Sequence, residues 1–269
     1  MKHLLIALFA LFTISASAQN TSSNQESSDT LSQEQEWAIL LTEQIFLHAI
    51  DSVMEEGMYM QALEVLDSLQ ANWKKITGKE PSPQMYIRKA IIYLNLEEWK
   101  QLIDVTTECI YYNKESMPDK TAALMYSMQG LGYRNLEVYK QAIRSYEFAS
   151  IYYLKAEEFG NHGDMICNIA YSYNKLGKFS AASSFYEKGL MKFLQYFNTT
   201  KKQLLQSNLK VDDSYKKSVM GVFAEHLYNM AIFEQDNGDL LASKEYLLMS
   251  AHCGNNVAQS EYQRIYGRY

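Results

Sequence analysis

The sequence is poor in the residues that interrupt helices and in those that form disulfides. It contains only three prolines in 269 residues, and no segment alternates apolar and polar side chains as a half-buried strand would. Helices are therefore expected and sheets are not. The three cysteines form no CxxC pair and their number is odd. We expect Cys109, Cys167 and Cys253 to be free, buried thiols.

Sequence motifs for catalysis are also missing. The chain has no glycine-rich phosphate loop and no Gly-x-Ser-x-Gly turn. His48, His162 and His252 are isolated, and Glu225-His226 is interpreted as an exposed pair on a helix, so no histidine belongs to an HExxH pair. We therefore expect no catalytic residues, no metal site and no cofactor, and predict that the protein is not an enzyme.

The charge balance is acidic, with 25 basic and 31 acidic side chains and a net charge of −6. Nucleic acids and anionic membranes are bound by positive surfaces, so neither is an expected partner. Beyond the first residues, no stretch approaches eighteen uninterrupted apolar residues. No stable membrane insertion is expected once the leader has been removed.

The N-terminus has the pattern of a secretory leader. A basic start is followed by an apolar run over residues 4–14 and by Ala16-Ser17-Ala18, which suits signal peptidase. This predicts a signal peptide at 1–18, cleavage after Ala18 and export to the periplasm or outside the cell. Residues 19–33 contain one large apolar side chain, Leu31, and are predicted to be a disordered tether.

An internal repeat dominates the remainder of the chain. Three copies, each forty residues after the last, carry a tyrosine, a leucine and an aromatic residue at a spacing of three: Tyr93, Leu96 and Trp99; Tyr133, Leu136 and Tyr139; Tyr173, Leu176 and Phe179. Fainter copies lie before and after them, at 53–66 and 231–247. Glycine or proline stands where copies would join. Such a period is typical of stacked helical hairpins.

The pattern resembles the tetratricopeptide repeat (TPR). A small residue stands three positions before each tyrosine, and Leu176-Gly177 fits the turn between the two helices, where Glu97 and Glu137 replace glycine in other copies. The resemblance implies an all-α, right-handed superhelical solenoid of about five TPR-like hairpins. Hairpins one to four are expected at 34–197, an irregular insertion at 198–214, and the fifth hairpin with a C-terminal capping helix at 215–269.

The resemblance also implies a concave, partner-binding face on the first helix of each hairpin. The predicted groove residues are Ile87, Ile91, Leu94, Leu124, Leu131, Arg134, Tyr171 and Asn174. Asp164 and Cys167 occupy lining positions in the same register. The apolar members of this stripe have two interpretations: a groove for a hydrophobic peptide or amphipathic helix, or ordinary core that neighbouring helices or a second copy bury.

The leading functional hypothesis is a non-catalytic protein–protein interaction scaffold of the bacterial periplasm or cell surface. It would bind a protein or peptide partner in the concave groove. The 21 tyrosines and three tryptophans leave a glycan-binding accessory protein as an alternative. A sensory module that signals through a separate chain is another. Homo-oligomerisation stays open.

Overall fold

The computed structural model describes residues 33–267, and every regular element between these residues is a helix. The described chain divides into two compact units, an N-terminal unit that ends at Met117 and a C-terminal unit that begins at Pro118. The predicted signal peptide (1–18) and residues 19–32 of the predicted tether lie outside the described residues. No helix in the described range is long and apolar enough to cross a membrane.

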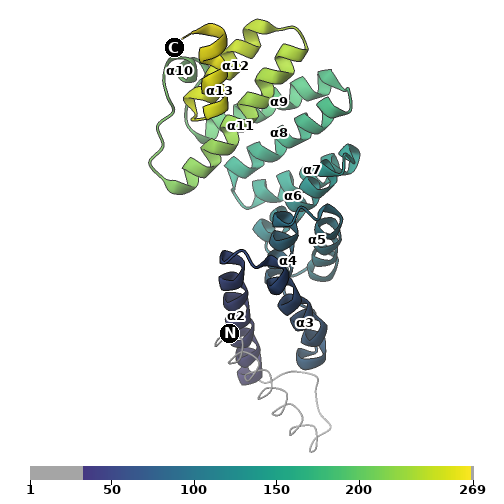
Figure 1. Ribbon diagram of the computed structural model, residues 1–269. Coiled ribbons are helices and arrows are strands. Elements are labelled where there is room, and N and C mark those ends of the chain that lie inside the picture. The colour runs from purple at the N-terminus through teal and green to yellow at the C-terminus, as the bar shows by residue number, and fades with distance from the viewer. Residues whose placement is uncertain (1–32, 268–269) are drawn as a thin grey trace, which may run out of the picture. The chain divides into compact units, whose positions relative to one another are not determined.

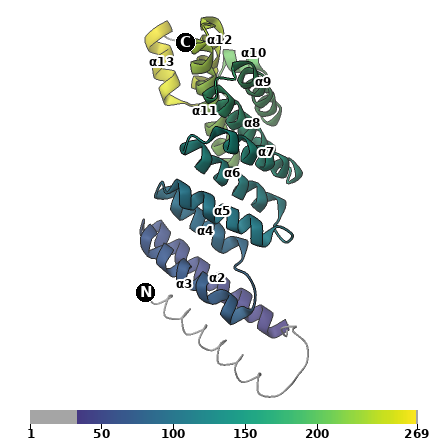
Figure 2. The same cartoon turned by 90° about the vertical axis from the view of Figure 1, so that its right-hand side faces the viewer.

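The N-terminal unit consists of two antiparallel hairpins, which Figure 2 shows as the neighbouring pairs α2 with α3 and α4 with α5. Its helices are α2 (Gln33–Glu55), α3 (Tyr59–Thr77), α4 (Pro83–Asn95) and α5 (Trp99–Asn113). Ile50, Leu66, Trp73, Met85 and Ile92 are buried together where α2, α3 and α4 meet. Each hairpin thus buries its apolar stripe against the next helix, as stacked repeats must.

The C-terminal unit also consists of helices (Figure 1). These are α6 (Asp119–Asn135), α7 (Tyr139–Lys155), α8 (Phe159–Lys175), α9 (Phe179–Tyr196), α10 (Lys201–Gln206), α11 (Ser214–Asp236), α12 (Leu240–His252) and α13 (Asn256–Tyr266). The pairs α6/α7, α8/α9 and α11/α12 are hairpins, and α13 packs on α12. The fold class is an all-α helical repeat.

The turns within the hairpins repeat their backbone geometry at the sequence period. Gly57, Glu97, Glu137 and Gly177 stand forty residues apart and have φ angles of 76°, 56°, 59° and 70°. A left-handed conformation costs an L-residue about 1–2 kcal/mol, a cost that glycine largely escapes. The two glutamates that depart from the glycine pattern therefore adopt the same turn, and stacking of the hairpins compensates for the strain.

Small residues lie where the helices of a hairpin approach closely. Ala170 on α8 is fully buried and belongs to one cluster with Ala182 and Tyr186 of α9. A Cβ atom added to Gly130 on α6 would lie 2.7 Å from the Tyr146 ring on α7. The small side chains of the repeat are therefore required by helix packing, because larger ones would push the two backbones apart.

Residues between α9 and α11 depart from the hairpin pattern. The short helix α10 is N-capped by Thr200, whose hydroxyl accepts a hydrogen bond from the backbone N–H of Gln203 in a capping box. Leu204 of this helix is buried, and the Leu209 amide donates to the His252 carbonyl at 3.0 Å. This segment therefore packs on the last hairpin and contributes to its core.

The three cysteines are free and buried, which confirms the expectation from their number and spacing. Burial raises the pKa of both Cys109 and Cys253 to about 12 and raises that of Cys167 well above its ordinary value. Burial disfavours the charged thiolate, so all three side chains are un-ionised packing groups.

Candidate functional site

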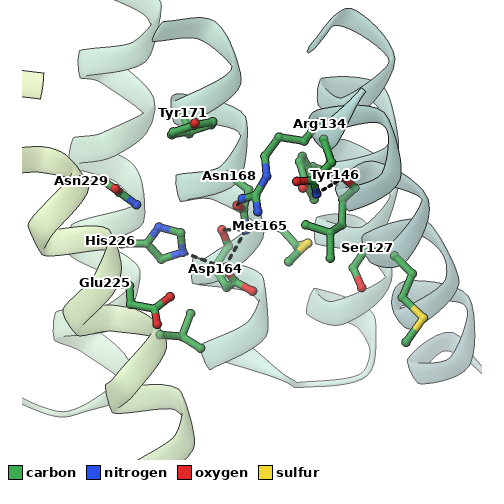
Figure 3. Close-up of a pocket in the computed structure, with 14 residues that line it drawn as sticks. Ser127, Arg134, Tyr146, Asp164, Met165, Asn168, Tyr171, Glu225, His226 and Asn229 are labelled. Carbon is green, nitrogen blue, oxygen red and sulfur yellow. Dashed lines mark hydrogen bonds and ion pairs between the residues drawn. The ribbon is translucent and has the colours of Figure 1, made fainter. Parts of the chain in front are cut away.

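The first helices of the hairpins in the C-terminal unit, α6, α8 and α11, surround an open pocket of about 520 Å³. Figure 3 shows side chains from these helices converging on it. Leu131, Met165 and Val222 supply apolar wall. Polar groups from the three helices make up much of the remainder, so the pocket combines apolar surface with several hydrogen-bonding groups.

Helix α11 reaches this position because of a close approach to α8. A Cβ atom on Gly160 would lie 2.7 Å from Val219 Cγ1, so glycine lets the two helices touch. Nearby, the Tyr215 hydroxyl donates to the Glu158 carboxylate, which also pairs with Lys120. These hydrogen bonds from Lys120 and Tyr215 lower the pKa of Glu158. The contact fixes the N-terminal half of α11 beside α8 and brings its middle to the pocket.

A chain of hydrogen bonds crosses the pocket. Arg134 Nη1 on α6 donates to Asn168 Oδ1 on α8 at 2.8 Å, and Asn168 Nδ2 donates to Asp164 Oδ1 at 2.7 Å. His226 Nε2 on α11 lies 2.7 Å from the same Asp164 oxygen. Figure 3 shows this sequence of contacts across the pocket wall. Since an ionised carboxylate only accepts hydrogen bonds, His226 donates to Asp164 through Nε2.

The charged groups at the pocket are incompletely paired. Arg134 has no carboxylate within ion-pair distance among the described residues, and its guanidinium carbon lies 5.6 Å from the centre of the Tyr171 ring. Glu225 is exposed and has no ion-pair or hydrogen-bond partner among residues 33–267. Asp164 is 24% exposed and accepts both of its side-chain contacts through Oδ1. Charge therefore remains available to an occupant.

His226 is the most unusual member of the site. The residue is 6% exposed and its ring is directed into the pocket between α11 and α8 (Figure 3). Its second nitrogen, Nδ1, is buried without a hydrogen-bond partner in the described chain. Buried polar atoms in proteins are nearly always paired, so each exception requires a reason.

The predicted groove residues are distributed over both units. Leu131, Arg134 and Tyr171 line the pocket. Leu124 and Asn174 are half-buried on α6 and α8 but are not part of its lining. Ile87, Ile91 and Leu94 are half-buried on α4 in the N-terminal unit. The five predicted apolar groove residues are all partly exposed, so each has apolar surface that a partner could contact.

Two interpretations of single residues were wrong. Cys167 does not line the groove: it is fully buried, because α8 and α9 approach so closely there that a Cβ on Gly189 would lie 2.3 Å from its sulfur. The lining runs instead through Asp164, Asn168 and Tyr171. His226 is not an exposed neighbour of Glu225, since successive helical residues point in different directions and only Glu225 faces solvent.

Several site residues were missed by sequence reasoning. Asn168, Glu225, His226 and Asn229 line the pocket, yet none was a groove candidate. A signal existed for Asn168, which precedes Tyr171 by three positions on the same helix face. No local signal connects His226 with Asp164, because they are 62 residues apart. The described residues contain no cluster of three or more groups suited to a metal ion.

Comparisons with known proteins show the fold. No protein-family model matches the chain, and no curated protein matches it. Among solved structures, BtubC (BKLC) from P. vanneervenii aligns with a TM-score of 0.62 at 11% identity, over 100% of this chain and 93% of that one. TPR-like repeats of a kinesin light chain from Podosopora anserina align at 0.55 and 13% identity, over 82% and 96% of the two chains.

The quorum sensor NprR from B. thuringiensis is similar as well. Its apo form aligns with a TM-score of 0.55 at 18% identity, covering 98% of this chain and 67% of that chain. Together with the hairpins described above, these likenesses establish a fold of the tetratricopeptide-repeat type, an all-α helical-repeat superhelix. At such identities they establish the fold and not the activity.

Proposed function

We propose that this protein is a non-catalytic protein-interaction scaffold that binds a peptide or helical segment of a partner in the pocket of its C-terminal unit. The observation that carries the proposal is the convergence of incompletely paired polar groups from α6, α8 and α11 on one open pocket of about 520 Å³. Ligand sites characteristically combine apolar wall with a few convergent polar groups.

A structural relative supports the choice of a peptide. NprR has been solved in complex with its cognate peptide NprX, and that structure aligns with this chain at a TM-score of 0.51 and 18% identity. The same hairpin architecture can therefore hold a peptide. The residues that do so in this chain have to come from its own pocket, where Leu131 offers apolar contact and Asn229 offers an amide for backbone groups.

The aromatic residues favour a protein partner over a glycan. Tyr146 and Tyr186 are buried in the core, and the Tyr171 ring is approached by Arg134 at 5.6 Å and by Lys175 at 5.3 Å. A sugar stacks on an open aromatic face, and the aromatic face at this pocket already interacts with cations. The abundance of tyrosine thus reflects packing between helices more than ligand stacking.

Peptide display on the full-length protein tests the proposal. Peptides selected against the wild type should lose at least about tenfold in affinity for Leu131→Lys, because a charge would replace apolar wall. The matched control is Ile151→Lys at an exposed position of α7, which should bind as the wild type does. Melting curves show whether each variant is folded.

Other results of this experiment would contradict the assignment of the binding site to this pocket. A stability loss near that of a core truncation for Leu131→Lys, about 2–5 kcal/mol, would assign Leu131 to the core. Equal binding by both variants would place the partner elsewhere. The half-buried Ile87, Ile91 and Leu94 of the N-terminal unit remain predicted partner contacts, and the same assay with Ile91→Lys tests them.

We also propose that the scaffold acts in the periplasm or at the cell surface, since the first eighteen residues have a leader pattern. The mature chain should then begin at Gln19. Intact-mass measurement of the protein from its native host decides this, because a retained Met1 would contradict export with cleavage.

A further inference from the structure

The pocket separates charges of opposite sign. Asn168 stands between Arg134 and Asp164, accepting from the first at 2.8 Å and donating to the second at 2.7 Å. One side-chain amide thus keeps the guanidinium and the carboxylate from pairing directly. Direct pairing would neutralise both groups, whereas the amide leaves four guanidinium N–H donors and one carboxylate oxygen without partners among the described residues.

The acidic side of the pocket holds a second carboxylate. Glu225 on α11 lines the pocket with Asp164, and Figure 3 shows both carboxylates on the same side of it. Lys175 Nζ lies 5.3 Å from the centre of the same Tyr171 ring that Arg134 approaches. The pocket lining therefore has an acidic part formed by Asp164 and Glu225 and a basic part formed by Arg134. Lys175 is not part of the lining and contacts the Tyr171 ring.

His226 supports this division. Its Nε2–H donates to Asp164 Oδ1 at 2.7 Å and thereby fixes the direction of the carboxylate, whose second oxygen stays free of partners in the described chain. The other ring nitrogen, Nδ1, is buried by the protein itself and has no hydrogen-bond partner in the described chain.

We propose, building on the peptide-binding function above, that the pocket recognises an extended peptide with one cationic and one anionic side chain two residues apart. The cation lies against Asp164 and Glu225, and the anion lies against Arg134. Alternate side chains of an extended chain share one face at a spacing of about 7 Å. This spacing is comparable to the separation of Arg134 and Asp164, which the Asn168 amide bridges through hydrogen bonds of 2.8 and 2.7 Å. A ligand with a single charge would leave one part of the site desolvated and unpaired.

The test uses the capped tripeptide Ac-Lys-Ala-Glu-NH₂ with the full-length protein. Two isosteres remove one charge each: norleucine in place of lysine, and glutamine in place of glutamate. Binding is followed by NMR titration up to about 10 mM peptide, since a fragment of this size is expected near about 1 mM. We expect each neutral replacement to weaken binding about tenfold, which corresponds to 1.4 kcal/mol.

Variants then assign the two parts of the pocket. In Glu225→Gln the protein should no longer prefer lysine over norleucine but should still prefer glutamate over glutamine. In Arg134→Gln the reverse should hold. The controls Glu147→Gln and Arg144→Gln change exposed residues of α7 and should retain both preferences. A purely structural role for Glu225 or Arg134 would weaken all three peptides equally.

The outcomes separate this inference from the proposed function. The proposed site for two opposite charges, called the dipolar site below, is supported if Glu225→Gln loses only the preference for lysine and Arg134→Gln loses only the preference for glutamate. Binding without charge preference, unchanged preferences in both variants, or no binding at about 10 mM overturns it. In each of these cases, peptides selected by display that still depend on Leu131 would leave the scaffold function standing. Conversely, charge-dependent tripeptide binding without any selectable longer peptide would retain the dipolar site and contradict the scaffold.

Discussion

The approach of α8 to α9 at Gly189 provides a quantitative test of the packing. Gly189→Ala would place a methyl group 2.3 Å from Cys167 Sγ and 3.4 Å from the Cys167 backbone nitrogen. Atoms of this kind normally stay about 3.5–4.0 Å apart, so the sulfur would have to move by more than about 1 Å. Cys167 is fully buried and its surroundings cannot yield freely.

Two opposing effects determine the size of the change. Overpacking a core costs about 1–3 kcal/mol, and replacing glycine with alanine inside a helix gains about 1 kcal/mol. Gly189→Ala should therefore lower the free energy of unfolding by up to about 2 kcal/mol. For a chain of this size, this corresponds to a fall of about 4–8 °C in the melting midpoint.

A second substitution should reverse the loss. Cys167→Ala alone removes one buried sulfur and should cost about 1 kcal/mol. In the double variant the new methyl group occupies the vacated space, so stability should return to within about 0.5 kcal/mol of the wild type, a coupling of up to about 3 kcal/mol. Urea unfolding of the four proteins measures this cycle.

Gly221→Ala is the matched control. Gly221 is in the helix α11 and a Cβ there meets no atom within 4 Å, so the same substitution should stabilise the protein by about 1 kcal/mol. The reasoning is refuted if Gly189→Ala stabilises as Gly221→Ala does. Additive effects of Gly189→Ala and Cys167→Ala would refute it as well.

Four further predictions follow from local environments. Ala170→Leu should destabilise by about 1–3 kcal/mol in thermal melts because it overpacks the α8/α9 contact, whereas Lys178→Leu at the exposed turn should change stability by less than about 0.5 kcal/mol; equal effects would contradict the repeat register. Glu137→Gly should raise the free energy of unfolding by about 1 kcal/mol in urea, since it removes a side chain at a φ of 59°. A lower free energy of unfolding would show that interactions of the glutamate side chain outweigh the backbone strain. Burial lowers the pKa of His162, so at a pH below its ordinary value of 6.5 the unfolded chain takes up a proton that the folded chain does not. The free energy of unfolding should therefore decrease as the pH is lowered below 6.5, and His162→Gln should show a smaller decrease in unfolding experiments over the same pH range. Burial also raises the pKa of Cys109 to about 12, so a thiol reagent at neutral pH should label it only on unfolding, and rapid labelling of the native protein would contradict its burial.

The helices and their turns could be read from the sequence because they depend on local preferences. Apolar residues at helical spacing and breakers between copies specify hairpins before any tertiary contact is known. Glu97 and Glu137 were the exceptions to the turn pattern, yet their backbone is that of Gly57 and Gly177. The repeat enforces the turn geometry through packing on both sides, even where the local residue disfavours it.

The pocket could be predicted only in part. Leu131, Arg134 and Tyr171 follow from the repeat register, because equivalent positions of successive first helices face the same side. The interpretation of Cys167 was wrong because one residue along a helix rotates the side chain by about 100°. Which of two neighbouring residues faces the pocket depends on how closely α8 packs on α9, and the Gly189 contact turns Cys167 inward and Asn168 toward the pocket.

The sequence by itself determined a helical repeat, its forty-residue period, its small packing residues and its buried thiols, because each depends on neighbours within a few turns of helix. The tertiary structure alone decided which polar side chains meet. Asp164 and His226 are 62 residues apart, with α9 and the segment around α10 between them. Their contact exists because Gly160 lets Val219 approach and sets the position of α11, a distance that no sequence period encodes.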